Sequence, residues 1–129
     1  MKAFLFLLAF FLIAGTAVSY GQQRKTKHIT VTPRKADKVM AKKEVVVLDV
    51  RTPEEIALGQ LPDAVSLDFK SPDFQQKLSD LPKDKPYLVY CRSGNRSGKT
   101  VELMKTMGFI KVYDLKGGYD AYKESKAEK

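Results

Sequence analysis

Short apolar runs alternate with segments of helical pattern along most of the chain. The run Glu44–Arg51 contains the continuous, β-branched stretch VVVLDV, which is typical of a strand buried on both faces of a parallel sheet. A weaker alternation of apolar and polar residues at His28–Thr32 predicts a short edge strand. Three further runs also predict strands: Val65–Leu67, Tyr87–Tyr90 and Lys111–Leu115.

Helix-start signals follow several of these runs. Pro33 can occupy the first turn of a helix that continues over Arg34–Ala41. Thr52 is expected to be an N-cap, Pro53 the first helical residue, and Glu55 the end of a capping box. Three more helices are predicted: from Ser71 to the residues before Leu81-Pro82, over Ser97–Met107, and from Tyr119 into a tail that frays over residues 125–129.

The alternation of strands and helices predicts an α/β domain of three layers, with a central, mostly parallel five-stranded sheet flanked by helices on both faces. In such sheets, reactive groups gather at the carboxyl ends of the strands. Three segments place polar groups or glycines at such ends: Asp49 with Arg51, the loop after Tyr90, and Gly117-Gly118. The sequence therefore predicts a functional site at this edge of the sheet.

The first 21 residues are predicted to lie outside the domain. Lys2 is followed by the apolar, uncharged run Ala3–Val18, which is the pattern of a secretory signal peptide cleaved after Ala17 or Gly21. An uncleaved membrane anchor is the alternative, although the run is shorter than the roughly 20 residues of a membrane span. We expect a linker at 22–28, the domain at 29–124, and a periplasmic or secreted mature protein that does not contact the membrane.

The charge of the chain favours anionic partners. Lys and Arg number 23 against 15 Asp and Glu, which gives a net charge of +8. The basic residues form no compact stripe interleaved with aromatics, so nucleic acid is not a predicted partner, and a solvated basic surface is the alternative interpretation. The sequence contains no metal-ligand spacing and no nucleotide-binding glycine pattern, so we expect no metal and no cofactor.

Cys91 is the only cysteine, so it cannot form a disulfide within the chain. In an oxidising compartment a lone exposed thiol is an oxidation risk, which favours a chemical role. A buried structural cysteine at an ordinary strand-to-helix turn is the alternative.

Cys91 lies between a predicted strand and a predicted helix N-terminus, in the run YCRSGNRSGKT. Backbone N–H groups of the loop and of the first helical turn can all point at one sulfur, where they stabilise an anion. Arg92 and Arg96 add two positive charges. We therefore expect a lowered thiol pKa and a thiolate nucleophile at neutral pH, which needs no histidine base.

The rest of the loop is expected to bind substrate. Gly94 lets successive N–H groups face inward, Asn95 tolerates the left-handed conformation, and Ser97 can cap the following helix. Arg96 is expected to hold an oxyanion across the mouth of the loop, with Arg92 in an assisting role. The predicted substrate-binding residues are thus Arg92, Ser93, Gly94, Asn95, Arg96 and Ser97.

Two further pairs are predicted to support this loop. Asp49 and Arg51 lie two apart on one strand and so share a face. A structural ion pair, with Glu55 as a further candidate partner, is the favoured interpretation, and bracing of the Cys91 loop is the secondary one. Gly117-Gly118 is expected to permit close backbone approach near the loop, with direct substrate contact as the less favoured alternative.

Three segments, in this order, resemble the rhodanese family, and the similarity covers nearly all of residues 29–124. LDVRTPEEIALGQLPDAVSLD resembles the family's DVR and G-H-I-P-G-A segment, YCRSGNRS its active-site loop, and DLKGGYDAY its closing L-x-G-G-aromatic segment. Three residues depart from the family pattern: Gln60 replaces the common His, Asp63 the frequent Gly, and Tyr122 the common Trp. None of these positions is expected to carry the sulfur.

The resemblance implies a thiosulfate sulfurtransferase that needs no cofactor. Cys91 would take a sulfane sulfur from a small anionic donor such as thiosulfate, and become a persulfide. It would then pass that sulfur to cyanide, a small thiol or a protein thiol.

Other functions remain open on the sequence alone. A non-catalytic rhodanese-like module could bind a partner through the same loop, and an envelope redox protein could form a mixed disulfide through Cys91. Cysteine-dependent phosphatases that resemble the rhodanese fold have five residues between Cys and Arg. Here there are four between Cys91 and Arg96, which disfavours phosphatase or arsenate reductase chemistry.

Overall fold

The computed structural model describes residues 24–129. The predicted signal peptide and the first two residues of the predicted linker lie outside the described residues. Five parallel strands form one sheet in the order β1-β5-β4-β2-β3. Their bounds are β1 Lys27–Val31, β2 Val46–Asp49, β3 Val65–Ser66, β4 Pro86–Tyr90 and β5 Lys111–Leu115.

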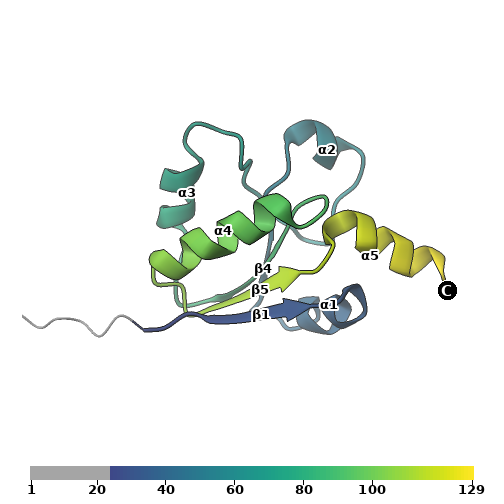
Figure 1. The fold of residues 1–129 in the computed structure, drawn as a ribbon, viewed down its shortest axis with the longest axis horizontal. Coiled ribbons are helices and arrows are strands. Elements are labelled where there is room, and N and C mark those ends of the chain that lie inside the picture. Colours follow the sequence, from purple (N-terminus) through teal and green to yellow (C-terminus); the bar gives the residue numbers. More distant parts are fainter. Residues whose placement is uncertain (1–23) are drawn as a thin grey trace, which may run out of the picture.

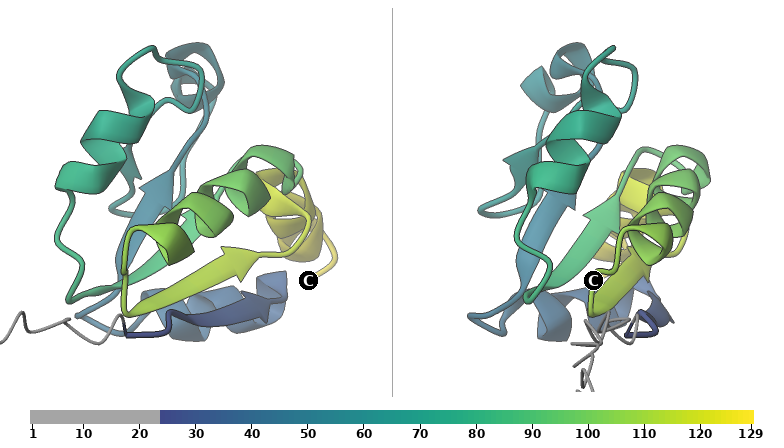
Figure 2. Two further views of the ribbon diagram at one scale, coloured as in Figure 1. Left: turned by 60° about the vertical axis from the view of Figure 1, so that its left-hand side comes forward. Right: turned by 90° about the vertical axis from the view of Figure 1, so that its left-hand side faces the viewer.

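Helices cover both faces of this sheet (Figure 1, Figure 2). One face carries α3 and α4, which bury Phe74, Leu78, Val101 and Met104 against the strands. On the other face lie α1 and α5, and the core there includes Ala36 and Val39. The three-layer α/β prediction is thereby confirmed. The helix bounds are α1 Pro33–Met40, α2 Pro53–Ala57, α3 Phe74–Asp80, α4 Asn95–Thr106 and α5 Gly118–Ala127.

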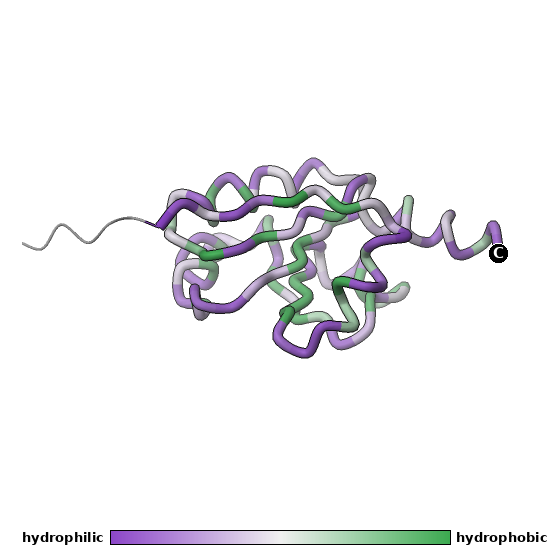
Figure 3. Tube along the Cα trace, turned by 90° about the horizontal axis from the view of Figure 1, so that it is seen from below, coloured by the Kyte–Doolittle hydropathy of each residue, from purple (hydrophilic) through white to green (hydrophobic). Residues whose placement is uncertain are grey.

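Alternation along each strand divides the core in two. Val89 and Cys91 face the α3 and α4 layer, whereas Leu88 and Tyr90 face the α1 and α5 layer. Figure 3 shows many hydrophobic positions in the inner parts of the trace and hydrophilic positions on many of its outer turns. This division places the Cys91 side chain beneath the first turn of α4.

The structure corrects three local predictions. Helix α4 starts at Asn95 and not at Ser97, because Gly94 (φ 105°) takes the left-handed conformation and serves as N-cap. Asn95 is helical, and Ser97 is not the cap. Among the described residues other than glycine, positive φ occurs only at Asp63 (φ 56°), a conformation that Asp tolerates and that suits a position where the rhodanese family often has Gly.

The terminal helix is also longer than expected. It reaches Ala127, three residues into the segment for which the sequence predicted a frayed tail. Lys126 makes an ion pair with Asp37 of α1, and the Tyr122 hydroxyl donates to the same carboxylate at 2.7 Å. These contacts hold the last turn of α5 against α1.

The junction of α5 with the Cys91 loop depends on Gly118. The amide of Tyr119 donates to the Cys91 carbonyl at 2.8 Å, and the amide of Asp120 donates to the Arg92 carbonyl at 3.0 Å. Gly118 has φ 63°, and a Cβ there would lie 2.5 Å from the Arg92 carbonyl oxygen. This is a close backbone approach of the kind that the glycine pair predicts.

We predict that Gly118→Ala destabilises the domain by more than the roughly 1–2 kcal/mol of a left-handed conformation alone, because backbone atoms must also move. Urea unfolding would measure the change. Gly98→Ala in α4 is the matched control, since a Cβ at that position meets nothing within 4 Å. It should be neutral or stabilising by up to about 1 kcal/mol. Equal stability of the two variants would contradict the proposed role of Gly118.

Candidate active site

The thiol of Cys91 lies inside the loop that connects β4 to α4. Its side chain is buried, with 1% of the residue exposed. The amide of Gly94 donates to Sγ at 3.1 Å, and Sγ lies 3.6 Å from the Ser97 hydroxyl oxygen. Beside the thiol, the Ser97 hydroxyl donates its single hydrogen to the Gly94 carbonyl at 3.2 Å, and beside a thiolate it can turn that hydrogen toward Sγ. The loop therefore surrounds the sulfur with hydrogen-bonding groups from one short segment.

These contacts favour the thiolate. Burial alone would raise the pKa of Cys91, but hydrogen bonds from the Ser97 amide and hydroxyl and from the amides of Gly94 and Ser93 outweigh it, so the pKa lies below the ordinary thiol value. The N-terminus of α4, whose twelve residues align their peptide dipoles, begins directly at this loop. The predicted lowering of the thiol pKa thus has a visible structural cause.

Helix α5 determines which backbone groups of the loop are available to an anion. The carbonyl oxygens of Cys91 and Arg92 accept hydrogen bonds from the amides of Tyr119 and Asp120. Because α5 binds these carbonyls, the loop presents amides to the sulfur. The Gly117-Gly118 pair therefore acts through the backbone of the loop.

Arg96 pairs with Glu55, which the sequence analysis considered as a partner of Asp49 and Arg51. Its two terminal nitrogens donate to the two carboxylate oxygens of Glu55 at 2.8 and 2.7 Å. Glu55 also closes the capping box of α2, where it accepts from the amide and the hydroxyl of Thr52. The Arg96 guanidinium holds the pKa of Glu55 well below its usual range. The expectation that Glu55 would join Asp49 and Arg51 was therefore wrong.

A polar cavity of about 500 Å³ lies in front of the loop. Three cations, Lys70, Arg92 and Arg96, and one carboxylate, Glu55, contribute to its walls. Arg92 is exposed and makes no ion pair with any residue in the range 24–129, whereas Arg96 is already bonded to Glu55. The full set of lining residues is Thr52, Glu55, Lys70, Arg92, Ser93, Asn95 and Arg96. This arrangement suits a small anion.

Asp49 and Arg51 form a buried ion pair at the end of β2. The Arg51 guanidinium donates to Asp49 at 3.0 and 2.8 Å and to the Gly59 carbonyl at 2.8 Å. Its central carbon lies 4.3 Å from the centre of the Tyr119 ring, and Tyr90 donates its hydroxyl to Asp49. The pair therefore links β2, the residue before Cys91 and helix α5, which supports the structural interpretation with bracing of the loop as its consequence.

The family model of the rhodanese-like domain matches residues 32–125 of this chain. The chain belongs to the rhodanese family. A sulfurtransferase of Allochromatium vinosum is 38% identical over 79 residues, a match that covers 61% of this chain and 72% of that protein. A rhodanese-related protein of Thermoplasma volcanium has a similar structure, with a TM-score of 0.67 and 28% identity over 75% of this chain and 92% of its own.

Similarity also extends to one part of longer proteins. A tRNA uridine(34) hydroxylase of Rickettsia akari is 33% identical over 103 residues, which are 77% of this chain but only 42% of that protein. Membership of the rhodanese family therefore supports a sulfurtransferase-type role without naming the donor or the acceptor.

Two residues of this rhodanese site were missed by the sequence analysis. Lys70 lines the cavity from the connection that follows β3, and nothing in its local sequence marks it. Asp114 of β5 has a buried carboxylate oxygen, Oδ1, without a hydrogen-bond partner. Burial raises the pKa of Asp114. Alternation along β5 could have indicated that Asp114 shares a sheet face with Val112 and the α4 layer.

The thiol environment predicts the pH dependence of alkylation. The rate of reaction of Cys91 with iodoacetamide should rise with pH to a midpoint below the free-thiol value of about 8.5. Ser97→Ala should move that midpoint upward because a hydrogen bond to the sulfur is lost. Ser93→Ala is the control, since Ser93 acts through its amide and its exposed side chain can be removed. A midpoint unchanged by both substitutions would contradict the role of Ser97.

Proposed function

We propose that this protein is a thiosulfate sulfurtransferase in which Cys91 carries the transferred sulfur. The observation that supports it most strongly is the buried thiol with the Gly94 amide 3.1 Å from Sγ, at the N-terminus of α4 and in a loop whose neighbouring residues line a cavity with cations. A thiolate in this position can both attack a sulfane sulfur and remain stabilised as a persulfide anion. Its rhodanese membership and its sulfurtransferase relatives support the same chemistry.

The reaction proceeds in two balanced transfers. The Cys91 thiolate attacks the outer sulfur of thiosulfate, the S–S bond of thiosulfate breaks, and its electron pair leaves with sulfite. Cys91 is then a persulfide anion, which the loop amides and the N-terminus of α4 stabilise. Cyanide or a thiolate next attacks the outer sulfur, forms thiocyanate or a new persulfide, and releases the Cys91 thiolate. No external oxidant, reductant or cofactor is needed.

Arg92 and Lys70 are the proposed donor-binding cations. Both line the cavity in front of the loop, and neither makes an ion pair within residues 24–129. The sequence had assigned the leading role to Arg96, whose terminal nitrogens donate to Glu55 instead. Arg96 then contributes mainly by neutralising Glu55, which would otherwise repel an anionic donor from the same cavity.

The acceptor is proposed to be a separate thiol. Cys91 is the only cysteine of the chain, so no second cysteine can take the sulfur from it. A protein thiol and a small thiol both fit this chemistry. A non-catalytic binding module and an envelope redox protein are the alternatives, and neither explains why cations line the cavity beside a stabilised thiolate.

We further propose that the protein is exported, as the apolar run Ala3–Val18 indicates. Residues 24–129 contain no helix that is both long enough and apolar enough to cross a membrane. Sequencing the N-terminus of protein isolated from cells would test the proposal. A start at Val18 or Gln22 supports cleavage, whereas retention of the whole run supports an anchor.

Thiocyanate formation from thiosulfate and cyanide should be abolished by Cys91→Ser. The substitution removes the nucleophile but nearly conserves its size, so the urea midpoint should change little. Thiocyanate would be measured with ferric ion under initial-rate conditions. Substantial turnover by the variant would refute the role of Cys91, and a folded wild-type protein without turnover would refute thiosulfate as the donor.

Arg92→Ala should raise KM for thiosulfate about tenfold, because a charged hydrogen bond to the donor is lost. The rate constant for reaction of the persulfide with cyanide should change less. Arg34→Ala is the matched control, since Arg34 is exposed on α1 and lies outside the cavity. Similar KM values for the two variants would remove Arg92 from donor binding.

A further inference from the structure

The positive charge of the domain is concentrated in four segments. Residues 24–27, 41–45, 81–86 and 105–111 lead into β1, β2, β4 and β5. They contain nine of the 22 Lys and Arg in residues 24–129, but only two of the 15 Asp and Glu. The remaining residues therefore carry 13 of each sign, and the whole excess of seven positive charges lies in these segments. The nine are Arg24, Lys25, Lys27, Lys42, Lys43, Lys83, Lys85, Lys105 and Lys111.

The parallel topology brings these segments to one end of the molecule. Lys27 is paired with Lys111, which is paired with Pro86, and Val46 is paired with Tyr87. Parallel strands all start at the same edge, so the nine basic residues gather at this end of the molecule, and this end is here named the cationic face. In Figure 1 the arrowheads of β1 and β5 point away from it. Cys91, which follows the end of β4, lies at the opposite edge of the sheet.

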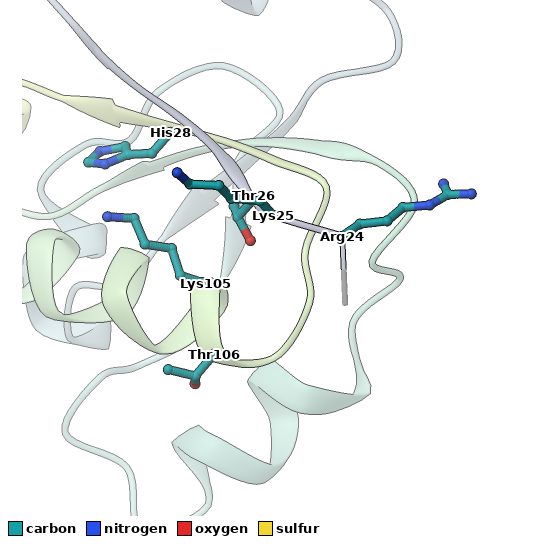
Figure 4. Close-up of a pocket in the computed structure, with 6 residues that line it drawn as sticks. All are labelled: Arg24, Lys25, Thr26, His28, Lys105 and Thr106. Atoms are coloured by element: carbon teal, nitrogen blue, oxygen red, sulfur yellow. The ribbon is translucent and has the colours of Figure 1, made fainter. Parts of the chain in front are cut away.

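The cationic face includes a cavity of about 770 Å³ (Figure 4). Lys25 and Lys105 extend their ammonium groups toward the side where His28 lies, whereas Arg24 points away. The Thr26 hydroxyl on the cavity wall is buried and has no hydrogen-bond partner. The nearby carboxylate of Glu102 pairs with Lys105 at 2.7 Å. Lys25 and His28 therefore remain available to an anionic group.

The chemistry of the cationic face favours a lipid surface over nucleic acid. Eight of its nine cations are lysines, which act as flexible point charges, whereas arginine is preferred for paired recognition of nucleic-acid phosphates. Its aromatics are buried: Tyr113 lies beneath Lys42 and Lys111, and Phe109 beneath Lys83. They offer no exposed ring for a base to stack on. Clustered lysines with no base-reading groups are typical of contact with anionic headgroups.

The position of the apolar run in the sequence also supports a lipid surface as the partner. The apolar run Ala3–Val18 ends six positions before Arg24, a reach of at most about 20 Å. An apolar run retained in a bilayer would therefore bring the cationic face, and not the Cys91 loop, to the membrane. If the run is removed, the charge of the face is unchanged, because Lys2 is the only cation that is lost.

In contrast to the expectation from the sequence that the mature protein does not contact the membrane, we propose that the cationic face binds an anionic lipid surface, with a headgroup phosphate in the cavity beside Lys25 and His28. The Cys91 loop then faces the aqueous phase, where it is open to donor and acceptor. This surface is independent of the sulfur-transfer chemistry, so either proposal can fail without the other.

Lysine acetylation of the full chain, read by mass spectrometry, tests the contact. Vesicles would contain phosphatidylcholine alone or with about one-third phosphatidylglycerol. The anionic vesicles should protect lysines of the cationic face about threefold relative to the neutral ones, and about 0.5 M salt should remove the difference because the Debye length falls to about 4 Å. Equal protection by both vesicles would overturn the proposal, even if the apolar run inserts into each.

Two charge-matched variants sharpen the test. The triple variant Lys27→Glu, Lys43→Glu, Lys85→Glu reverses three exposed cations of the face, and Lys99→Glu, Lys116→Glu, Lys123→Glu reverses three exposed cations elsewhere. Only the first should abolish the extra protection of Lys42 and Lys83 by anionic vesicles. Equal loss in both variants would indicate a response to net charge and overturn the proposal. Stronger protection by an oligonucleotide at equal phosphate concentration would assign the face to nucleic acid instead.

Discussion

The first turn of α5 binds the backbone of the Cys91 loop, and the chemistry of the site depends on this contact. Tyr119 and Asp120 donate their amides to the carbonyls of Cys91 and Arg92. With those carbonyls occupied, the amides of the loop and of the first α4 turn are left for the sulfur. Two segments that are 28 residues apart in sequence thus form one anion-stabilising site, and Gly118 is the residue that allows them to approach.

Charge around this loop is balanced locally. Arg51 is neutralised by Asp49 and Arg96 by Glu55, so each buried or half-buried guanidinium serves to hold a neighbouring element. Two buried or half-buried ion pairs, rather than free charges, therefore position α2, β2 and the loop. The exposed cations of the cavity, Arg92 and Lys70, remain for an incoming anion. Arginines that look alike in the sequence therefore have different roles: Arg51 and Arg96 are structural, whereas Arg92 is proposed to bind substrate.

Much of the fold could be predicted because its signals are local. Apolar β-branched runs identified the strands, and Thr52-Pro53-Glu54-Glu55 identified a capping box that the structure contains. The position of Cys91 between a strand and a helix could also be predicted from the sequence. The partner of Arg96 could not be predicted in this way. Glu55 could pair with Arg51 or with Arg96, and only the path of the chain after β2 decides between them. Likewise, Lys70 reaches the cavity from the connection between β3 and α3, residues 67–73, which has no periodic pattern.

The central claim is that Cys91 receives sulfur as a stabilised thiolate. The most direct measurement is the intact mass of the full chain after incubation with thiosulfate and removal of the excess, followed by location of the modification in peptides. A gain of one sulfur atom on Cys91, reversed by cyanide with release of thiocyanate, is the predicted result. A mass unchanged by thiosulfate, or a thiol adduct on Cys91 that cyanide does not convert to thiocyanate, would contradict it.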